Sequence, residues 1–485
     1  MKKRILSIFL ALTLLLSALA GCGGDAPSAQ PGTGTNALVQ SGAPTDGDKT
    51  PADTSDPATE TPEESEETFP APDYSNFVMP EETDTLVLYA AESLSKPMNT
   101  AVPLFEKSYP GVNIDLQFMK ESEFQNRVRT EVAAGRGPDV ILTDSNAFPD
   151  IYKTMSTGIF EDLNPYVLND ADFDLSDYIE SVMDGGVLFG RRYLLPVQYQ
   201  YPMLLTTEEI LTDIGVEAES LGTYQGFLDA CTAYREKKPD GLLFQFVGGE
   251  TDLRRLYEYS GLRMIDYEKN AVSFNEERFR QMIDICRLFE GTVPENGITK
   301  NSSEVLSEDE CLFGDGQSVL LMLWDCILLK MYGLNPVLTL GTDENDGATA
   351  QIVYYSAIPG GAANKRNGWR FIKILLSDEI QYGLDDTKQN QNPLFYAGNP
   401  VRKESLEKMI RYYASRYMKD FPEYMTEDDV ISFTQKTMAV TSAVMRPPVI
   451  FNAVRDNMTP YIEGKDSYDK CLGKLMNELE LYKDE

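Results

Sequence analysis

The spacing of hydrophobic residues in the first part of the folded chain predicts a series of elements. Residues 84–91 (DTLVLYAA) are almost continuously apolar, as in a strand covered on both faces. Met98, Val102 and Phe105 then recur at the spacing of one helical stripe. Residues 112–118 alternate between apolar and polar side chains, as in a strand with one solvated face. The pattern predicts strand, helix and strand in this order.

The same alternation continues through a second helix and a third strand. Phe124, Val128 and Val132 recur every four residues with polar residues between them, and Gly135 supplies the conformation that often ends a helix. The apolar run 140–142 that follows is typical of a buried strand. Strands that alternate with helices indicate an α/β fold with a parallel sheet and crossover helices.

Polar residues follow two of the predicted strands at the points where the strands end. Glu92 and Ser93 come after the first strand, and Asp144 and Asn146 come after the third. Open α/β sheets bind their ligands at the carboxyl ends of the strands, so these four residues are candidate ligand contacts. Helix N-capping is the alternative, because Ser, Asp and Asn are preferred caps.

The start of the chain has the pattern of an export signal. Lys2, Lys3 and Arg4 precede an apolar run that ends in Leu-Ala-Gly-Cys at Cys22. This ending resembles the bacterial lipobox, whose cysteine is lipidated, so residues 1–22 are expected to be a lipoprotein signal peptide. An ordinary secretory signal with a chance cysteine is the alternative.

Residues 23–82 have the composition of an acidic, disordered tether, because they are rich in Pro, Gly, Ser, Thr, Asp and Glu. The whole chain carries a formal net charge of −34. This charge argues against nucleic acid and against an anionic membrane surface as partners. The lipid bilayer is therefore expected to be contacted only through the Cys22 anchor, at the outer face of the cytoplasmic membrane.

Histidine is absent from the sequence, which removes the commonest general base and the commonest zinc ligand. No metal site and no cofactor is expected. The cysteines other than Cys22 have no C-x-x-C spacing and mostly apolar neighbours, so buried free thiols are favoured over a disulfide framework. A single disulfide among them is the alternative. These five cysteines are Cys231, Cys286, Cys311, Cys326 and Cys471.

Several segments, in the same order along the chain, resemble the bacterial extracellular solute-binding proteins of family 1. The match begins with YPGVNIDLQF (109–118), EVAAGRGPDVILTDS (131–145) and GIFEDLNPYV (158–167). It continues with residues 189–211, 312–325, 368–384, 399–409 and 461–480. None of these segments is specific alone, but their order along the chain is.

This resemblance implies a two-lobe periplasmic-binding-protein-like fold, in which each lobe has a mainly parallel sheet flanked by helices. Lobe 1 would comprise residues 83–196 and 357–398, and lobe 2 residues 197–356 and 399–485. Hinge crossings would join the lobes, and a small ligand held between them would favour the closed state. The family further implies a monomer that delivers a sugar or oligosaccharide to an ABC permease.

The resemblance also points to candidate ligand contacts outside the strand ends. Gln198, Tyr199 and Tyr201 lie at the expected first crossing, and packing under the hinge is their alternative role. Trp324 is a candidate stacking platform, with Asp325 beside it, although the apolar residues before Trp324 also suit a core position. Arg446 and Phe451 are placed near the ligand by the family pattern. Trp369, in contrast, lies at helical spacing with apolar neighbours and is expected to pack.

Three functions remain compatible with the sequence. The first is a lipid-anchored receptor of an ABC importer. The second is the same fold with a non-sugar ligand, or with a role in sensing or adhesion. The third is a surface glycosidase, which requires a pair of carboxylates that the sequence does not identify. We therefore expect a binding protein rather than an enzyme.

Overall fold

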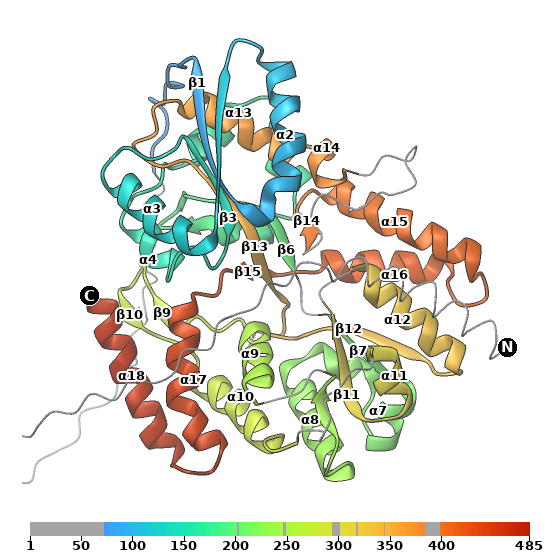
Figure 1. Ribbon diagram of the computed structural model, residues 1–485. Coiled ribbons are helices and arrows are strands. Elements are labelled where there is room, and N and C mark those ends of the chain that lie inside the picture. Colours follow the sequence, from blue (N-terminus) through green and yellow to red (C-terminus); the bar gives the residue numbers. More distant parts are fainter. Residues whose placement is uncertain are drawn as a thin grey trace, which may run out of the picture. The chain divides into compact units, whose positions relative to one another are not determined.

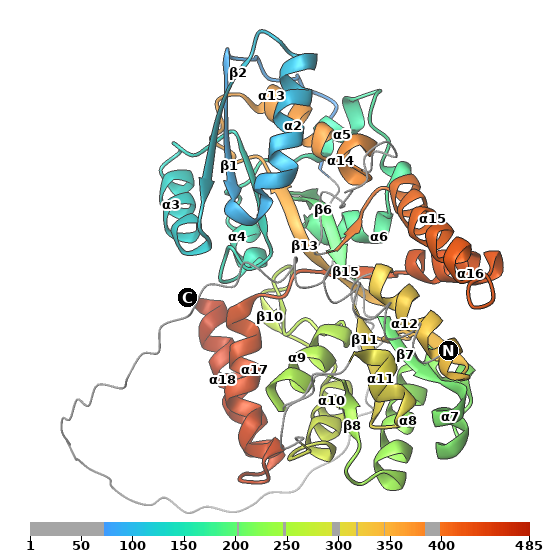
Figure 2. The ribbon, with the colours of Figure 1, turned by 45° about the vertical axis from the view of Figure 1, so that its right-hand side comes forward.

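The computed structural model describes residues 72–200, 203–245, 249–292, 301–316, 319–343, 345–383 and 398–485. It contains two larger β-sheets with helices around them (Figures 1 and 2). The α/β architecture expected from the sequence is confirmed.

The first sheet has the strand order β14-β6-β13-β3-β1-β2, with β15 paired to β13. β1 is parallel to both β2 and β3, whereas β13 is antiparallel to β3 and β6. Its strands are β1 (Thr85–Ala91), β2 (Asn113–Met119), β3 (Val140–Asp144), β6 (Leu195–Gln200), β13 (Thr349–Ala357), β14 (Asn399–Pro400) and β15 (Ser442–Val444). The βαβ units are thus parallel as expected, whereas β13 lies antiparallel between β3 and β6, and β15 pairs parallel with β13.

The helices expected between the first three strands form where the pattern places them. Phe124, Val128 and Val132 of α3 are buried, and Gly135 has a φ of +66° directly after the helix. The helices beside this sheet are α2 (Ser95–Ser108), α3 (Glu121–Ala133), α4 (Ile151–Ser156), α5 (Asn164–Asn169), α6 (Glu180–Met183), α13 (Lys365–Leu375) and α14 (Asp378–Gln381). Trp369 of α13 is buried, as expected for a packing residue.

The second sheet has the strand order β12-β7-β11-β8. β11 is parallel to β8 and antiparallel to β7, and β12 is antiparallel to β7. Its strands are β7 (Met203–Thr207), β8 (Leu242–Phe244), β11 (Cys311–Gly316) and β12 (Pro336–Leu340). This sheet is therefore mixed, and β8 and β11 are its parallel pair.

Helices of the later part of the chain accompany the second sheet, and α17 and α18 pack side by side (Figure 2). They are α7 (Glu208–Ile214), α8 (Tyr224–Lys237), α9 (Gly249–Tyr259), α10 (Glu276–Leu288), α11 (Ser302–Ser307), α12 (Val319–Tyr332), α15 (Lys403–Asp420), α16 (Glu427–Met438), α17 (Pro448–Ile462) and α18 (Tyr468–Asp484). Two short hairpins, β4 (Val187–Leu188) with β5 (Arg191–Arg192) and β9 (Ile265–Asp266) with β10 (Ala271–Val272), complete the strands described. Single-turn 3₁₀ helices are η1 (Glu92–Leu94), η2 (Leu175–Asp177), η3 (Asp184–Gly186) and η4 (Ala218–Gly222).

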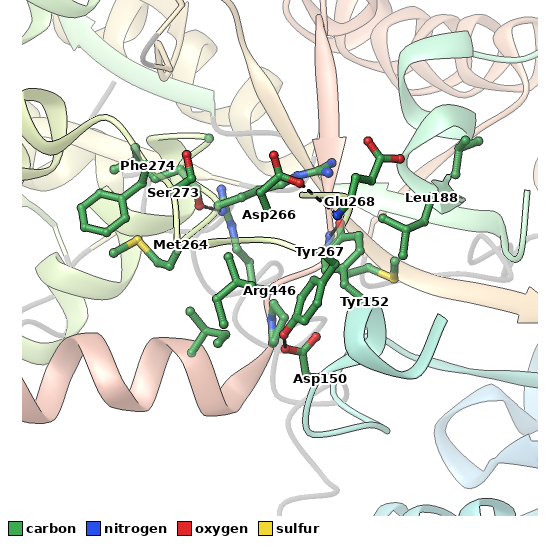
Figure 3. Close-up of a pocket in the computed structure, with 18 of the residues that line it drawn as sticks. Asp150, Tyr152, Leu188, Met264, Asp266, Tyr267, Glu268, Ser273, Phe274 and Arg446 are labelled. Atoms are coloured by element: carbon green, nitrogen blue, oxygen red, sulfur yellow. Dashed lines mark hydrogen bonds between the residues drawn. The ribbon is translucent and has the colours of Figure 1, made fainter. Parts of the chain in front are cut away.

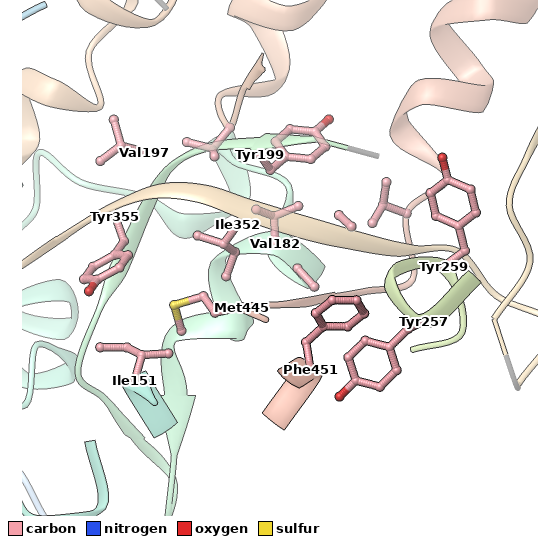
Figure 4. Packing of buried hydrophobic residues seen from close by; sticks show 14 of the residues in the cluster. Ile151, Val182, Val197, Tyr199, Tyr257, Tyr259, Ile352, Tyr355, Met445 and Phe451 are labelled. Carbon is pink, nitrogen blue, oxygen red and sulfur yellow. The ribbon is translucent and has the colours of Figure 1, made fainter. Parts of the chain in front are cut away.

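The chain passes between the sheets at several points. β6 pairs in the first sheet through Gln200, and β7 begins in the second sheet at Met203. β13 pairs in the first sheet along Thr349–Ala357. Residues 197–200 and 349–356, which the sequence analysis assigned to lobe 2, thus pair in the sheet of lobe 1. Figure 4 shows the buried side chains of β6 and β13 near Met445 and Phe451.

Residues 72–82, which composition assigned to the tether, pack on lobe 1, and we call them the N-terminal strap. The hydroxyl of Tyr74 donates to Asp162, and the ring of Phe77 lies edge-on to Tyr166 at 5.0 Å between centroids. Glu82 at the end of the strap forms an ion pair with Arg370. Aromatic contacts and an ion pair thus attach this segment to lobe 1, which an averaged composition does not reveal.

The five cysteines expected to be free thiols are free, and all but the half-buried Cys326 are buried. The disulfide alternative is thereby excluded for these residues. Among the residues described, no helix has the length and apolar character needed to span a membrane. Cys22 and residues 23–71 lie outside the described residues.

Candidate functional site

The carboxyl ends of β1 and β3 carry four of the predicted contacts. Glu92 and Ser93 are exposed after β1. The Oδ1 atom of Asp144 accepts the backbone N–H of Asn146 at 2.8 Å, which closes a tight turn after β3. None of these four side chains caps a helix, since α2 lacks a side-chain cap and Asp150 caps α4. Helix N-capping, the alternative role of these four residues, is therefore not observed.

Burial raises the pKa of Asp144 above its ordinary value, against the backbone N–H groups that favour its charged form. Asn146 is exposed, and its carbonyl accepts from the side chain of Gln125 at 3.0 Å. Two hydrogen bonds thus hold the turn, one to the Asp144 side chain and one to the Asn146 carbonyl. Asn146 itself is exposed.

A cavity of about 240 Å³, which we call the small cavity, lies against this turn. It joins the end of β3 to β13, α9 and the start of α17, and Asn146, Gln200, Arg254, Glu258, Gln351 and Phe451 are among its lining residues. Asn146, Arg446 and Phe451 are the predicted contacts that the structure brings together here.

Charged side chains from α9 dominate the polar part of the small cavity. Burial raises the pKa of Glu258, whereas a hydrogen bond with Gln351 and the charges of Arg446, Arg255 and Arg254 favour the carboxylate. Arg446 donates to the carbonyl oxygens of Leu262, at 3.0 Å, and of Glu258. Arg446 therefore donates mainly to backbone groups, and Glu258 is a buried carboxyl group with three arginines near it.

The apolar part of the small cavity is aromatic. Phe451 is buried, and its ring centroid lies 5.9 Å from that of Tyr257 (Figure 4). The guanidinium of Arg254 lies over the ring of Phe451 at 4.4 Å. A polar and an apolar surface thus meet within one small space.

Strand alternation directs successive side chains of the first crossing to opposite faces of β6. Tyr199 is fully buried, and its hydroxyl donates to the carbonyl of Thr437 at 3.5 Å, so its surroundings suit packing. Gln198 is also buried, and no described residue pairs with its amide atoms. Gln200, on the same face of β6 as Gln198, lines the small cavity. Tyr201 lies outside the described residues.

Trp324 and Asp325 lie on α12, away from the small cavity. The ring of Trp324 contacts Tyr417 and Phe421, at centroid distances of 5.6 and 5.4 Å. Burial raises the pKa of Asp325 to about 6, against hydrogen bonds from Ser303 and Ser302 of α11. These contacts attach α12 to α15 and α11 rather than to the small cavity.

A larger cavity of about 760 Å³ lies beside the small one and shares Tyr257 and Arg446 with it. Its lining comes from residues 150–192, from the hairpin β9–β10 and from the start of α17. Figure 3 shows Tyr267 of this hairpin pointing to Asp150, to which its hydroxyl donates. Asp150 is buried and also caps α4. The hairpin is thereby attached to α4.

Three polar residues of the small cavity were not predicted from the sequence: Arg254, Glu258 and Gln351. The charged residues of α9 have the pattern of an ordinary solvated helix face, and Gln351 is a single polar residue in a strand, so neither pattern indicates a binding site. Their approach to Asn146 depends on the crossings of the chain, which no local pattern specifies. Among the described residues, no group of three or more Asp, Glu or Cys side chains is arranged to hold a metal ion.

The sequence between residues 81 and 382 matches the family model described as bacterial extracellular solute-binding protein. This match covers more than half of the chain. The chain belongs to this family. The resemblance noted in the sequence is thus confirmed, and the chain is a bacterial extracellular solute-binding protein.

Solved structures show the same fold for this solute-binding protein. The sugar-binding protein MalE from Xanthomonas citri matches with a TM-score of 0.57 and 17% identity, over 82% of this chain and 97% of its own. A periplasmic oligogalacturonide binding protein from Yersinia enterocolitica has a TM-score of 0.56 and 14% identity, over 82% and 99%. The cyclic alpha-maltosyl-1,6-maltose binding protein from Arthrobacter globiformis has a TM-score of 0.53 and 12% identity, over 82% and 98%. The two-lobe periplasmic-binding-protein fold is confirmed.

Proposed function

We propose that this solute-binding protein captures a sugar or oligosaccharide in the small cavity and delivers it to an ABC importer. The observation that carries the proposal is the pairing, in one cavity, of an aromatic surface with fixed polar groups. Phe451, whose ring Arg254 covers at 4.4 Å, and Tyr257 form the aromatic wall, and Asn146, Gln351 and Glu258 offer amide and carboxyl groups. Sugars present C–H faces and hydroxyl groups, which require these two kinds of partner.

The residues that line the small cavity come from two parts of the chain, which the crossing segments connect. Ser145 and Asn146 follow β3 of the first sheet, and Arg254, Glu258 and Phe451 come from α9 and α17. A ligand that contacts both groups favours the conformation in which they are close together. Hinge closure between lobe 1 and lobe 2 would in this way report a bound ligand to the permease.

We further propose where the protein is located and in which oligomeric state it acts. The protein is exported, is anchored through lipidated Cys22 and acts as a monomer beside its permease. It acts without catalysis. Glycoside hydrolysis normally requires two carboxylates, and Glu258 is the one carboxylate among the described residues lining the small cavity.

A thermal-shift screen with a site variant tests this function. The mature chain would be melted with glucose, galactose, maltose, maltotriose and trigalacturonate, and with amino acids and tripeptides for comparison. A ligand at a hundredfold excess over Kd stabilises the folded state by about 2.7 kcal/mol. At least one sugar is expected to raise the Tm, and Glu258→Gln is expected to weaken its binding at least tenfold.

Glu407→Gln is the matched control, because Glu407 is an exposed glutamate on α15. It should leave the shift unchanged. Stabilisation by peptides or amino acids alone would contradict the sugar assignment and favour the non-sugar alternative. A full sugar shift in Glu258→Gln would place the ligand elsewhere.

A further inference from the structure

Two separate parts of lobe 2 contact the same small region of lobe 1. The hairpin β9–β10 contacts α4 and the turn between β4 and β5, and the last turn of α18 contacts α4. α18 packs against both β10 and α17, so the hairpin and these two helices form one block of lobe 2. The residues in contact lie outside the segments that cross between the sheets. The two lobes therefore meet at a surface that the chain connection does not impose.

The turn of the hairpin β9–β10 makes two hydrogen bonds to lobe 1. The hydroxyl of Tyr267 donates to Oδ2 of Asp150, the residue that caps α4 (Figure 3). The next residue, Glu268, accepts the backbone N–H of Phe189 through Oε1 at 2.6 Å. Successive residues of the hairpin turn thus bind two different segments of lobe 1.

The end of α18 makes the third contact. Nζ of Lys153 on α4 donates to the backbone carbonyl of Tyr482 at 2.5 Å and lies over the Tyr482 ring at 4.2 Å. A cation is favourable at this place, because the carbonyl groups in the last turn of a helix lack partners within the helix. We call the three contacts the interlobe latch; they are Tyr267–Asp150, Glu268–Phe189 and Tyr482–Lys153.

The contacts of the interlobe latch are strong enough to matter and weak enough to open. Each joins a carboxyl or ammonium group to a neutral partner, and Lys153, Tyr267 and Tyr482 are half-buried, so water can replace these partners. Such partly exposed hydrogen bonds each shift an equilibrium by about threefold to tenfold. The two conformations of a protein commonly differ in population by about tenfold to a thousandfold. Three such bonds can therefore decide which conformation is populated.

The elements that carry the interlobe latch also border the small cavity. α4 follows the turn of Asn146, α17 carries Phe451, and both of these residues line that cavity. The backbone N–H of Val449 on α17 also donates to the carbonyl of Pro149, directly before α4, at 3.4 Å. We propose that the interlobe latch holds the lobes in the conformation in which both line the small cavity, and that opening requires its release. The latch acts in the ligand-free protein, whereas its effect on sugar affinity rests on the proposed function.

Distance measurements between the lobes of the ligand-free mature chain test the interlobe latch. Spin labels at Lys107→Cys on α2 and Glu236→Cys on α8, two exposed positions, would report the distance by pulsed electron resonance. Labelling of the chain without these cysteines gives the background of the natural thiols. Tyr267→Phe combined with Lys153→Met should add a population at a different distance and change the ratio of the two conformations by about tenfold or more. Glu268→Ala should change it in the same direction by a smaller factor.

Tyr461→Phe combined with Lys330→Met is the matched control. The hydroxyl of Tyr461 donates to Asp284 at 2.5 Å, and Lys330 pairs with Asp429 at 2.9 Å. All four residues lie on helices of lobe 2, so the control removes the same two groups without a contact between the lobes. Its distance distribution should equal that of the natural chain, even if its Tm is lower.

Calorimetric titration with the sugar found in the thermal-shift screen adds a second readout. The apparent affinity of the Tyr267→Phe/Lys153→Met chain should fall by the same factor as its fraction in the latched conformation. Unchanged distances in this chain, or an equal change in the control, would contradict the latch whichever ligand binds. Changed distances with an unchanged affinity would contradict its coupling to the small cavity. If the distances change as expected but the natural chain binds no sugar, the proposed function fails and the latch stands.

Discussion

Asp252, on α9, is a half-buried residue whose carboxyl Oδ1 atom is shielded from water and has no hydrogen-bond partner among the described residues. Burial raises its pKa from 3.8 to about 7, with Arg255 opposing the shift and Glu290 adding to it. Its charge also raises the pKa of the Cys286 thiol on α10. A group with a raised pKa in the folded state binds protons more tightly there than in the unfolded chain, so its stability contribution depends on pH.

Replacement of Asp252 by asparagine should remove this dependence. Between about pH 4 and pH 7 the folded state binds the extra proton, so the contribution of Asp252 to stability falls as the pH rises through this range. One pKa unit corresponds to about 1.4 kcal/mol, so the cost at pH 7.5 is a few kcal/mol. Asp252→Asn should therefore melt higher than the natural chain at pH 7.5 and at the same temperature at pH 4.

The difference between the two chains is the quantity to measure, because the pH dependence of all other groups cancels in it. Thermal melts at half-unit steps of pH would give the curve. A Tm difference that stays constant from pH 4 to pH 7.5 would contradict the raised pKa.

At the same scale, the sequence pointed to some residues of the candidate site and not to others, for identifiable reasons. Asn146 was predictable because a strand end is visible in the hydrophobic pattern. Tyr199 and Gln200 are neighbours, and strand alternation sends one into the core and the other toward the small cavity, but the pattern does not say which. Trp324 was predicted to be a stacking platform or a core residue, and the sequence could not decide between them, because its aromatic contacts are Tyr417 and Phe421 at the end of α15, nearly a hundred residues later.

At the scale of elements, the connection from α3 to β3 depends on Gly135. This glycine has a φ of +66°, and nothing lies within 4 Å of the position that a Cβ atom would take. The space therefore permits a side chain, but the backbone conformation disfavours one. The effect of this conformation on stability can thus be measured without a change in packing.

Gly135→Ala should lower the free energy of unfolding by about 1–2 kcal/mol, because a left-handed conformation costs this much in residues with a Cβ atom. Gly111, after α2, is a matched control: it also has free space around its Cβ position, and its φ is not positive. Gly111→Ala should be neutral or slightly stabilising. Urea unfolding of both variants measures the difference, and equal stabilities would contradict the assignment.

The sequence predicted these elements well because each one is encoded locally. The stripe of α3, the glycine after it and the apolar run of β3 lie within two dozen residues. The antiparallel entry of β13 beside β3 could not be predicted in this way, because the two strands are about two hundred residues apart. α9 contacts β13 through a similar long-range approach of the chain. The residues that α9 contributes to the candidate site were therefore not predictable from local patterns.

At the scale of the whole molecule, the N-terminal strap shows how the first described residues are attached to lobe 1. Tyr74 and Phe77 attach it to Asp162 and Tyr166, and Glu82 pairs with Arg370. All of these partners belong to lobe 1. The strap is thus part of the folded unit even though its composition resembles that of the residues before it.

A chain that begins at residue 83 should therefore be less stable than one that begins at residue 72. Burial of one aromatic side chain contributes about 1.5–3 kcal/mol, and Phe77 is partly buried, so loss of the strap should cost about 2–3 kcal/mol. Thermal and urea unfolding of the two chains check this. Identical stabilities would mean that the strap rests on lobe 1 without stabilising it.

The strap also has a mechanical consequence if the protein is anchored through Cys22. A force on the anchor would reach the described part of the chain at residue 72 and would be transferred to lobe 1 through Tyr74 and Phe77. The crossing segments between the lobes lie outside this path. Flow or drag at the cell surface would then load the strap, while the equilibrium between open and closed lobes would remain under the control of the ligand.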